Sequence, residues 1–103
     1  MTVGQLATVA RVNDVPPGTA WVVKAGDREL ALFNVDGTFY ATQNECLHLK
    51  GPLGDGELDG PVVTCPWHGY QYDVRTGENE FDRALQLETF EVVVEDGVVK
   101  VAL

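Results

Sequence analysis

The sequence is poor in cysteine, histidine and basic residues. Its 103 residues include two cysteines, two histidines and seven lysines or arginines, and 16 acidic residues set the net charge at −9. Phosphate contacts need clustered lysine and arginine, so nucleic-acid binding and anionic membrane surfaces are disfavoured. No run approaches the roughly 18 apolar residues that a membrane-spanning helix needs. The 45% hydrophobic content is nevertheless sufficient for a packed core without disulfides.

The amino terminus lacks a basic segment followed by an unbroken apolar stretch. We therefore expect no signal peptide and a cytoplasmic location. In that reducing compartment, two cysteines are expected to serve metal or redox chemistry rather than a structural disulfide. The excess of acidic residues fits either the steering of a basic protein partner or solubility alone.

Every cysteine and histidine of the chain lies in one of two short segments. One residue separates Cys46 from His48, two separate Cys65 from His68, and sixteen residues, 49–64, lie between the pairs. Thiolate sulfur and imidazole nitrogen are common protein ligands for iron and zinc. Four such donors, with none left over, predict a metal centre clamped between two segments.

The rest of the sequence has the pattern of an all-β protein. No segment keeps a 3.6-residue apolar period over the length of a helix, whereas Asp-Gly pairs between apolar runs are strong hairpin signals. Short strands at regular spacing predict an antiparallel sandwich or small barrel. We expect hairpins joining 29–35 to 38–41 and 90–94 to 98–101, and strands near 6–12, 20–25, 61–64 and 70–74, with 82–89 ambiguous.

The ligand segments are expected to project from this β scaffold as loops. Residues 43–56 contain few strand-forming residues, and the second ligand pair follows a predicted strand at 61–64. Trp21 is expected to lie in the core. The length of 103 residues is that of a single domain, without room for a second core.

The spacing of the ligands, with Gly51-Pro52-Leu53 after the first pair and Gly69 after the second, resembles the Rieske iron–sulfur family. The resemblance implies a single Rieske domain over residues 1–103. In such a domain, cluster-binding loops at about 44–72 are inserted in a β base.

The resemblance also implies the cofactor and its ligands. These are a [2Fe–2S] cluster with Cys46 and Cys65 on one iron and His48 and His68 on the other. Replacing two thiolates by neutral imidazoles makes the oxidised centre less negative, so Rieske potentials span about −150 to +300 mV, against about −400 mV for plant-type ferredoxins. No residue of this set is expected to be catalytic, because all four cluster positions are filled by protein.

Neighbouring residues predict a potential in the lower half of that range. High-potential members of the family carry two further cysteines, joined as a disulfide, and a serine after the second histidine. This chain has Lys50 or its neighbour and Trp67 at the cysteine positions and Tyr70 at the serine position. Tyr72, in contrast, matches a tyrosine that donates to a cysteine sulfur in the high-potential class.

An acidic, free-standing Rieske chain resembles the ferredoxin component of bacterial aromatic-ring-hydroxylating dioxygenase systems. The resemblance implies a soluble one-electron carrier between an NADH-dependent flavin reductase and a terminal oxygenase, with transient contacts to both. The chain has no spare histidine, nucleophilic cysteine or Ser-His-acid set, so it is not expected to be an enzyme by itself.

Other interpretations of the same residues stay open. Within electron transfer, the small subunit of an assimilatory NADH-dependent nitrite reductase has a similar fold and size. From another class, two cysteines and two histidines could hold a structural zinc ion in an interaction module. Trp67 could shield the sulfur atoms or dock a partner. The acids around the ligand loops could face a partner or only the solvent.

Overall fold

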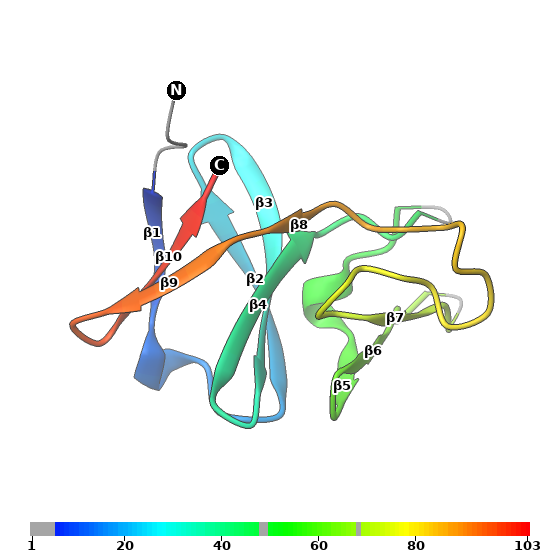
Figure 1. The fold of residues 1–103 in the computed structure, drawn as a ribbon, viewed down its shortest axis with the longest axis horizontal. Helices are drawn as coiled ribbons and strands as arrows, with labels where there is room; N and C mark the ends of the chain where they lie inside the picture. The colour runs from blue at the N-terminus through cyan, green and yellow to red at the C-terminus, as the bar shows by residue number, and fades with distance from the viewer. Residues whose placement is uncertain (1–5, 48–49, 68) are drawn as a thin grey trace.

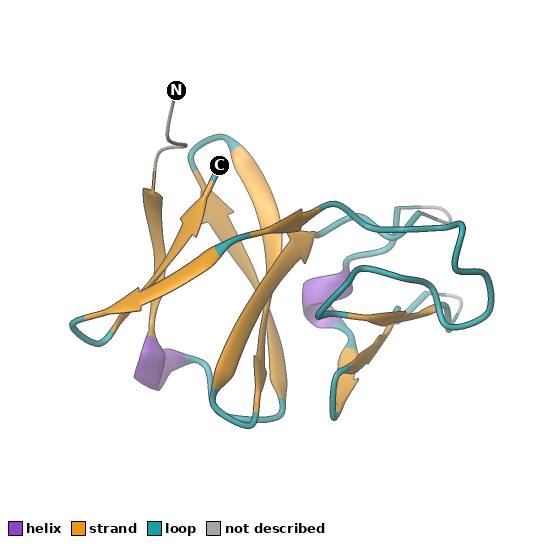
Figure 2. Ribbon diagram, viewed as in Figure 1, coloured by secondary structure: helices purple, strands orange, loops and turns teal. Residues whose placement is uncertain are grey.

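The computed structural model describes residues 6–47, 50–67 and 69–103, which form three β-sheets (Figures 1 and 2). Their elements are β1 (Leu6–Arg11), η1 (Val12–Asp14), β2 (Thr19–Ala25), β3 (Arg28–Val35), β4 (Thr38–Gln43), η2 (Leu53–Asp55), β5 (Glu57–Asp59), β6 (Val62–Thr64), β7 (Gln71–Asp73), β8 (Thr89–Phe90), β9 (Val92–Glu95) and β10 (Val98–Ala102). Two sheets, ordered β1-β10-β9 and β2-β3-β4-β8, form a base, and the sheet β5-β6-β7 lies beside it. All paired strands are antiparallel, so the predicted all-β class is confirmed.

Both predicted Asp-Gly hairpins are confirmed, as β3–β4 and β9–β10. At Asp36-Gly37 the φ angles are 51° and 95°, and at Asp96-Gly97 they are 52° and 77°. Positive φ at both central residues is the type I′ geometry, whose twist matches that of the flanking strands. The two 3-10 turns η1 and η2 are short, and the part of the chain that the structure describes has no helix long and apolar enough to cross a membrane.

Strand β3 is buried on both faces and joins two cores. Leu30 and Leu32 belong to the core between the two base sheets, whereas Ala31 and Phe33 belong to a second core. The division follows from the two-residue period of a strand, which sends successive side chains to opposite faces. The second core also contains both cysteines, so β3 links the packing of the base to the predicted ligand loops.

The predicted strand at 90–94 is divided between the two base sheets. β8 pairs with β4, whereas β9 pairs with β10, and Glu91 lies between them. Strands that change sheets in this way form the corners of β sandwiches. The short strand β5 was not predicted, and the ambiguous segment 82–89 is a loop with one isolated bridge that ends where β8 begins.

The expectation that Trp21 is a core residue is wrong, because its side chain is 44% exposed. β2 is an edge strand of its sheet, so no strand closes one side of Trp21. Val23 and Ala25 lie on the same face of β2, two and four residues further along, and they do reach the core.

The first ligand loop leads from the base towards the small sheet, and the second lies within that sheet. The first loop lies between β4 and η2, and the second connects β6 to β7. η2 packs against β2 and β3 and thereby attaches this part of the molecule to the base. After β7 the chain runs along the outside of the small sheet, yellow in Figure 1, before it returns to the base at β8. Among the described residues, one isolated bridge, with Tyr72 opposite Asn79, joins this outer segment to β7 of the sheet.

Candidate metal centre

The two segments that hold the predicted ligands are loops with the same hydrogen-bond pattern. In each, the N–H of the cysteine donates to the carbonyl five residues later, at 2.8 Å for Cys46 and 2.7 Å for Cys65. The cysteine carbonyl accepts from the N–H four residues later, at 3.1 Å in both loops. The residues that supply this N–H, Lys50 and Gly69, have left-handed φ angles of 58° and 75°. Each loop thus holds its cysteine at the base of a closed turn.

The structure brings the two cysteines together in the second core. Cys46 and Cys65 are 2% and 1% exposed, and neither forms a disulfide. They share this core with Leu53, which is fully buried. His48 and His68 lie outside the described residues, so the structure places two of the four predicted ligands. Two buried cysteines in one apolar core, with no disulfide between them, provide a sheltered site for a metal centre.

Gly51 leaves the space that the sulfur of Cys65 occupies. A Cβ atom at Gly51 would lie 2.6 Å from the Sγ atom of Cys65 and 3.1 Å from the ring of Trp67. Contacts shorter than about 3 Å are not tolerated without movement of the atoms concerned. Residue 51 must therefore be glycine for the first loop to approach the thiol of the second.

Tyr72 lies fully buried between the loops and contacts the first of them. Its Oη atom is 3.3 Å from the Sγ atom of Cys46, and the N–H of Leu47 donates to the same oxygen at 3.3 Å. Burial raises the pKa of Tyr72 well above its usual range, and the neighbouring Cys46 raises it further. The phenol therefore keeps its proton, and the predicted contact of Tyr72 with a cysteine sulfur is confirmed.

An ion pair follows Tyr72 along the chain. A carboxylate oxygen of Asp73 lies 2.8 Å from the guanidinium of Arg75, which also holds the pKa of Asp73 below its usual value. The pair forms at the exposed side of β7 and closes the turn after it.

The rim of the site is apolar on one side and acidic on another. Trp67 packs beside Gly51 but is 57% exposed, so it covers part of the site and also presents a large apolar surface to the solvent. The exposed acids Asp55 and Glu57 line an open hollow of about 470 Å³ that also touches Cys65. Both features are accessible to a partner protein.

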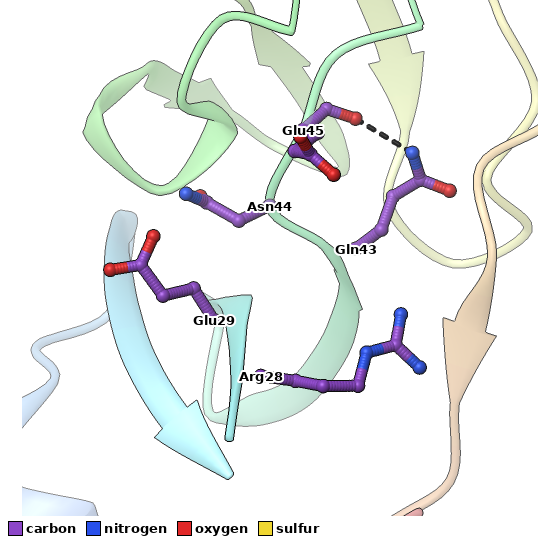
Figure 3. Close-up of a pocket in the computed structure, with 5 residues that line it drawn as sticks. All are labelled: Arg28, Glu29, Gln43, Asn44 and Glu45. Atoms are coloured by element: carbon purple, nitrogen blue, oxygen red, sulfur yellow. Dashed lines mark hydrogen bonds between the residues drawn. The ribbon is translucent and has the colours of Figure 1, made fainter. Parts of the chain in front are cut away.

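A second hollow, of about 300 Å³, lies where β3 begins and β4 ends (Figure 3). Three of the residues that line it have side-chain partners within the protein. Arg28 pairs with Glu88 at 2.9 Å, and the amide of Gln43 donates to the carbonyl of Glu45 at 2.7 Å. The side chain of Asn44 accepts from the N–H of Gly54 at 2.9 Å. The last of these bonds ties the start of the first loop to η2.

Sequence reasoning missed two contributors to the site. It noted the glycines of the loops but not that Gly51 makes room for a sulfur atom across the site. It also missed Asn79, which is 2% exposed and lies opposite Tyr72. From the sequence, an asparagine in such a position can be identified only as a turn-forming residue. Which residue it faces across the sheet is decided by the fold.

Comparison with known proteins gives a consistent result. A family model described as the Rieske [2Fe–2S] domain matches residues 5–91. The ferredoxin subunit of biphenyl dioxygenase from Pseudomonas sp. (strain KKS102) is 47% identical over 68 residues, which cover 65% of this chain and 62% of that protein. Ferredoxin CarAc from Metapseudomonas resinovorans is 40% identical over 96 residues, which cover 91% of this chain and 90% of that protein.

A solved structure resembles the whole fold. A chain in the complex of reduced oxygenase and oxidized ferredoxin in carbazole 1,9a-dioxygenase superposes with a TM-score of 0.84 at 38% identity. The superposition covers 94% of this chain and 92% of that chain. The likeness therefore extends over the base sheets and the loop region alike.

Proposed function

This chain belongs to the Rieske [2Fe–2S] domain family, and we propose that it carries single electrons from an NADH-dependent flavin reductase to a terminal ring-hydroxylating oxygenase. The observation that carries this proposal is the pair of buried, unbridged cysteines on two matching loops. Relatives that are ferredoxin components of biphenyl and carbazole dioxygenase systems support the proposal, as does the structure of a similar ferredoxin with its oxygenase.

The described residues fit the cluster of this family. Neither cysteine is in a disulfide, both are buried, and Gly51 leaves room for the sulfur of Cys65 to approach the other loop. We propose that Cys46 and Cys65 hold one iron and that His48 and His68 hold the other. The whole of residues 1–103 would act as one Rieske domain, with its cluster-binding loops at about 44–72.

When bound, a Rieske cluster accepts and returns one electron. The residues of this chain determine how readily it does so. Burial of both cysteines keeps water from the sulfur atoms, and water exclusion strengthens every nearby electrostatic interaction. A thiolate ligand has no proton, so at the 3.3 Å contact only the hydroxyl of Tyr72 can donate to the sulfur of Cys46.

We propose that partners dock transiently at the rim of the loops. Leu47 and Trp67 are exposed there, each within one or two residues of a proposed ligand. The net charge of −9, with Asp55 and Glu57 beside Cys65, would attract a basic surface and raise the rate of encounter. Two cysteines without a disulfide are consistent with a reducing compartment, and we propose a cytoplasmic location.

The proposed ligands are tested by substitution and metal analysis. We expect the purified chain to be red-brown, with iron and acid-labile sulfide in equal amounts, and a Rieske-type electron paramagnetic resonance spectrum after reduction by dithionite. Cys65→Ser and His68→Ala should each reduce bound iron at least tenfold, because each removes one ligand. Glu45→Gln, next to Cys46, should retain the cluster and serves as the control for changes in the loop. A colourless protein that binds one zinc ion would reject the proposal in favour of the zinc-stabilised module.

Substitution of Tyr72 should change the potential without removing the cluster. Tyr72→Phe deletes a hydrogen bond to a ligand sulfur, and such bonds stabilise the more negative reduced state. We expect the midpoint potential to fall by about 60 mV, which is tenfold in the equilibrium constant for one electron. A redox titration at constant pH measures the shift, with Tyr40→Phe on β4 as the control. An unchanged midpoint would show that the phenol does not donate to the sulfur.

A further inference from the structure

Asn79 is a buried side chain whose amide orientation is fixed by its own loop. Its Oδ1 atom accepts from the N–H of Phe81 at 2.8 Å and from the N–H of Asp82 at 2.9 Å. The backbone N–H of Asn79 donates to the carbonyl of Leu85 at 2.9 Å, which closes the loop. Since the oxygen of the amide faces these backbone donors, its nitrogen must point the other way.

The other side of Asn79 faces Tyr72. The two residues are directly opposite, and the flanking backbone hydrogen bonds, Asp73 to Glu78 and Glu80 to Gln71, are both 2.9 Å long. This pattern makes Tyr72 and Asn79 a non-hydrogen-bonded pair, in which side chains on the same face approach most closely.

The amide nitrogen of Asn79 is buried beside the phenol. Among the described residues it has no partner at hydrogen-bonding geometry. Burial and Cys46 raise the pKa of Tyr72, whereas the N–H of Leu47 and the amide of Asn79 act in the opposite direction. The N–H of Leu47 donates to the phenol oxygen at 3.3 Å, and the buried amide nitrogen of Asn79, which can only donate, belongs to the residue directly opposite Tyr72.

We propose that Asn79 is a positioning residue that keeps the hydroxyl proton of Tyr72 directed at the sulfur of Cys46. A phenol oxygen has one proton to donate and can accept from others. The N–H of Leu47 and the amide nitrogen of Asn79 can only donate, so neither can accept that proton, and the sulfur of Cys46 at 3.3 Å is the acceptor left for it. Asn79 thereby tunes the potential through Tyr72 without touching the cluster. The inference rests on the proposed ligation of a cluster by Cys46.

Asn79→Asp tests this role with little change of shape. One carboxylate oxygen can still accept from the backbone N–H groups of Phe81 and Asp82. The other replaces the amide donor by an acceptor, which draws the phenol proton away from Cys46. The new negative charge also lowers the midpoint potential by itself. This share of the shift in potential does not depend on the hydroxyl of Tyr72. The matched background for separating the two effects is Tyr72→Phe.

The experiment is a double-mutant cycle on the holoprotein, read by redox titration with iron and sulfide measured for each variant. We expect Asn79→Asp to lower the equilibrium constant for reduction at least tenfold, 59 mV for one electron, when Tyr72 is present. In the Tyr72→Phe background the same substitution should cause less than half that shift. Equal shifts in the two backgrounds would overturn the proposal, because the effect would then be charge alone.

An uncharged variant and the metal analysis separate the remaining outcomes. Asn79→Ser retains a hydroxyl acceptor for the loop but no amide donor, and we expect a threefold effect, about 28 mV, that disappears in the Tyr72→Phe background. If both Asn79 variants lose the cluster while Tyr72→Phe keeps it, Asn79 is a structural residue of the loop and the proposal is overturned. If the unmodified chain holds no iron and sulfide, the proposed function itself fails.

Discussion

Gly51→Ala is expected to abolish cluster binding while the β base stays folded. The new Cβ atom would lie 2.6 Å from the Sγ atom of Cys65, and ordinary van der Waals contact begins at 3.4 Å. The sulfur and the backbone of Gly51 must therefore separate by about 0.8 Å, the difference 3.4 − 2.6. Metal–ligand distances tolerate only about 0.2 Å, so the displaced thiolate cannot keep its bond to iron. The ring of Trp67 can move aside, whereas a sulfur that ligates the proposed cluster could not.

Iron and sulfide per folded chain measure this effect, and we expect at least a tenfold decrease. Far-ultraviolet circular dichroism should remain that of a β protein, because the core between the base sheets does not contact Gly51. Gly60→Ala is the matched control, since Gly60 lies in the turn between β5 and β6 and its added Cβ meets no atom within 4 Å. That control costs only the strain of a left-handed φ of 57°, of the order of 1 kcal/mol. A Gly51→Ala protein with a full cluster would mean that Cys65 does not place its sulfur here when the iron is bound.

The elements that could be predicted from sequence are those fixed by local chemistry. The turns at Asp36-Gly37 and Asp96-Gly97 follow from the residues that tolerate positive φ, and both adopt the expected geometry. The two ligand loops follow from the spacing of cysteine and histidine, which is local to each loop. The family match over residues 5–91 agrees with that interpretation.

The features that were missed depend on neighbours distant in sequence. Trp21 is apolar and lies in a strand, but its exposure follows from the place of β2 at the edge of its sheet. The division of the strand at Glu91 depends on which sheet lies nearer to each half. Asn79 reaches the site only because the chain after β7 folds back along the small sheet (Figure 1). No local pattern contains these arrangements.

Of the substitutions proposed for this protein, Leu53→Ala is expected to lower the free energy of unfolding most. Leu53 is fully buried, and its core includes Cys46, Cys65 and Tyr72. It is the first residue of η2, the element that attaches this part of the molecule to β2 and β3. Truncating a buried leucine to alanine removes apolar contacts and leaves a cavity, at a cost of about 2–5 kcal/mol.

For a domain of this size, that loss corresponds to a decrease in Tm of about 10 °C or more. Because unfolding with release of a cluster is irreversible, the variants are compared by thermal scans of the holoprotein at one scan rate. Leu6→Ala is the matched control: its side chain is 48% exposed, and the same truncation there should lower Tm by less than about 4 °C. The difference between the two leucines tests whether η2 couples the loops to the base. Equal decreases in Tm would show that the core around the thiols contributes no more to stability than the surface of β1. The proposal that this core shelters the cluster would then be rejected.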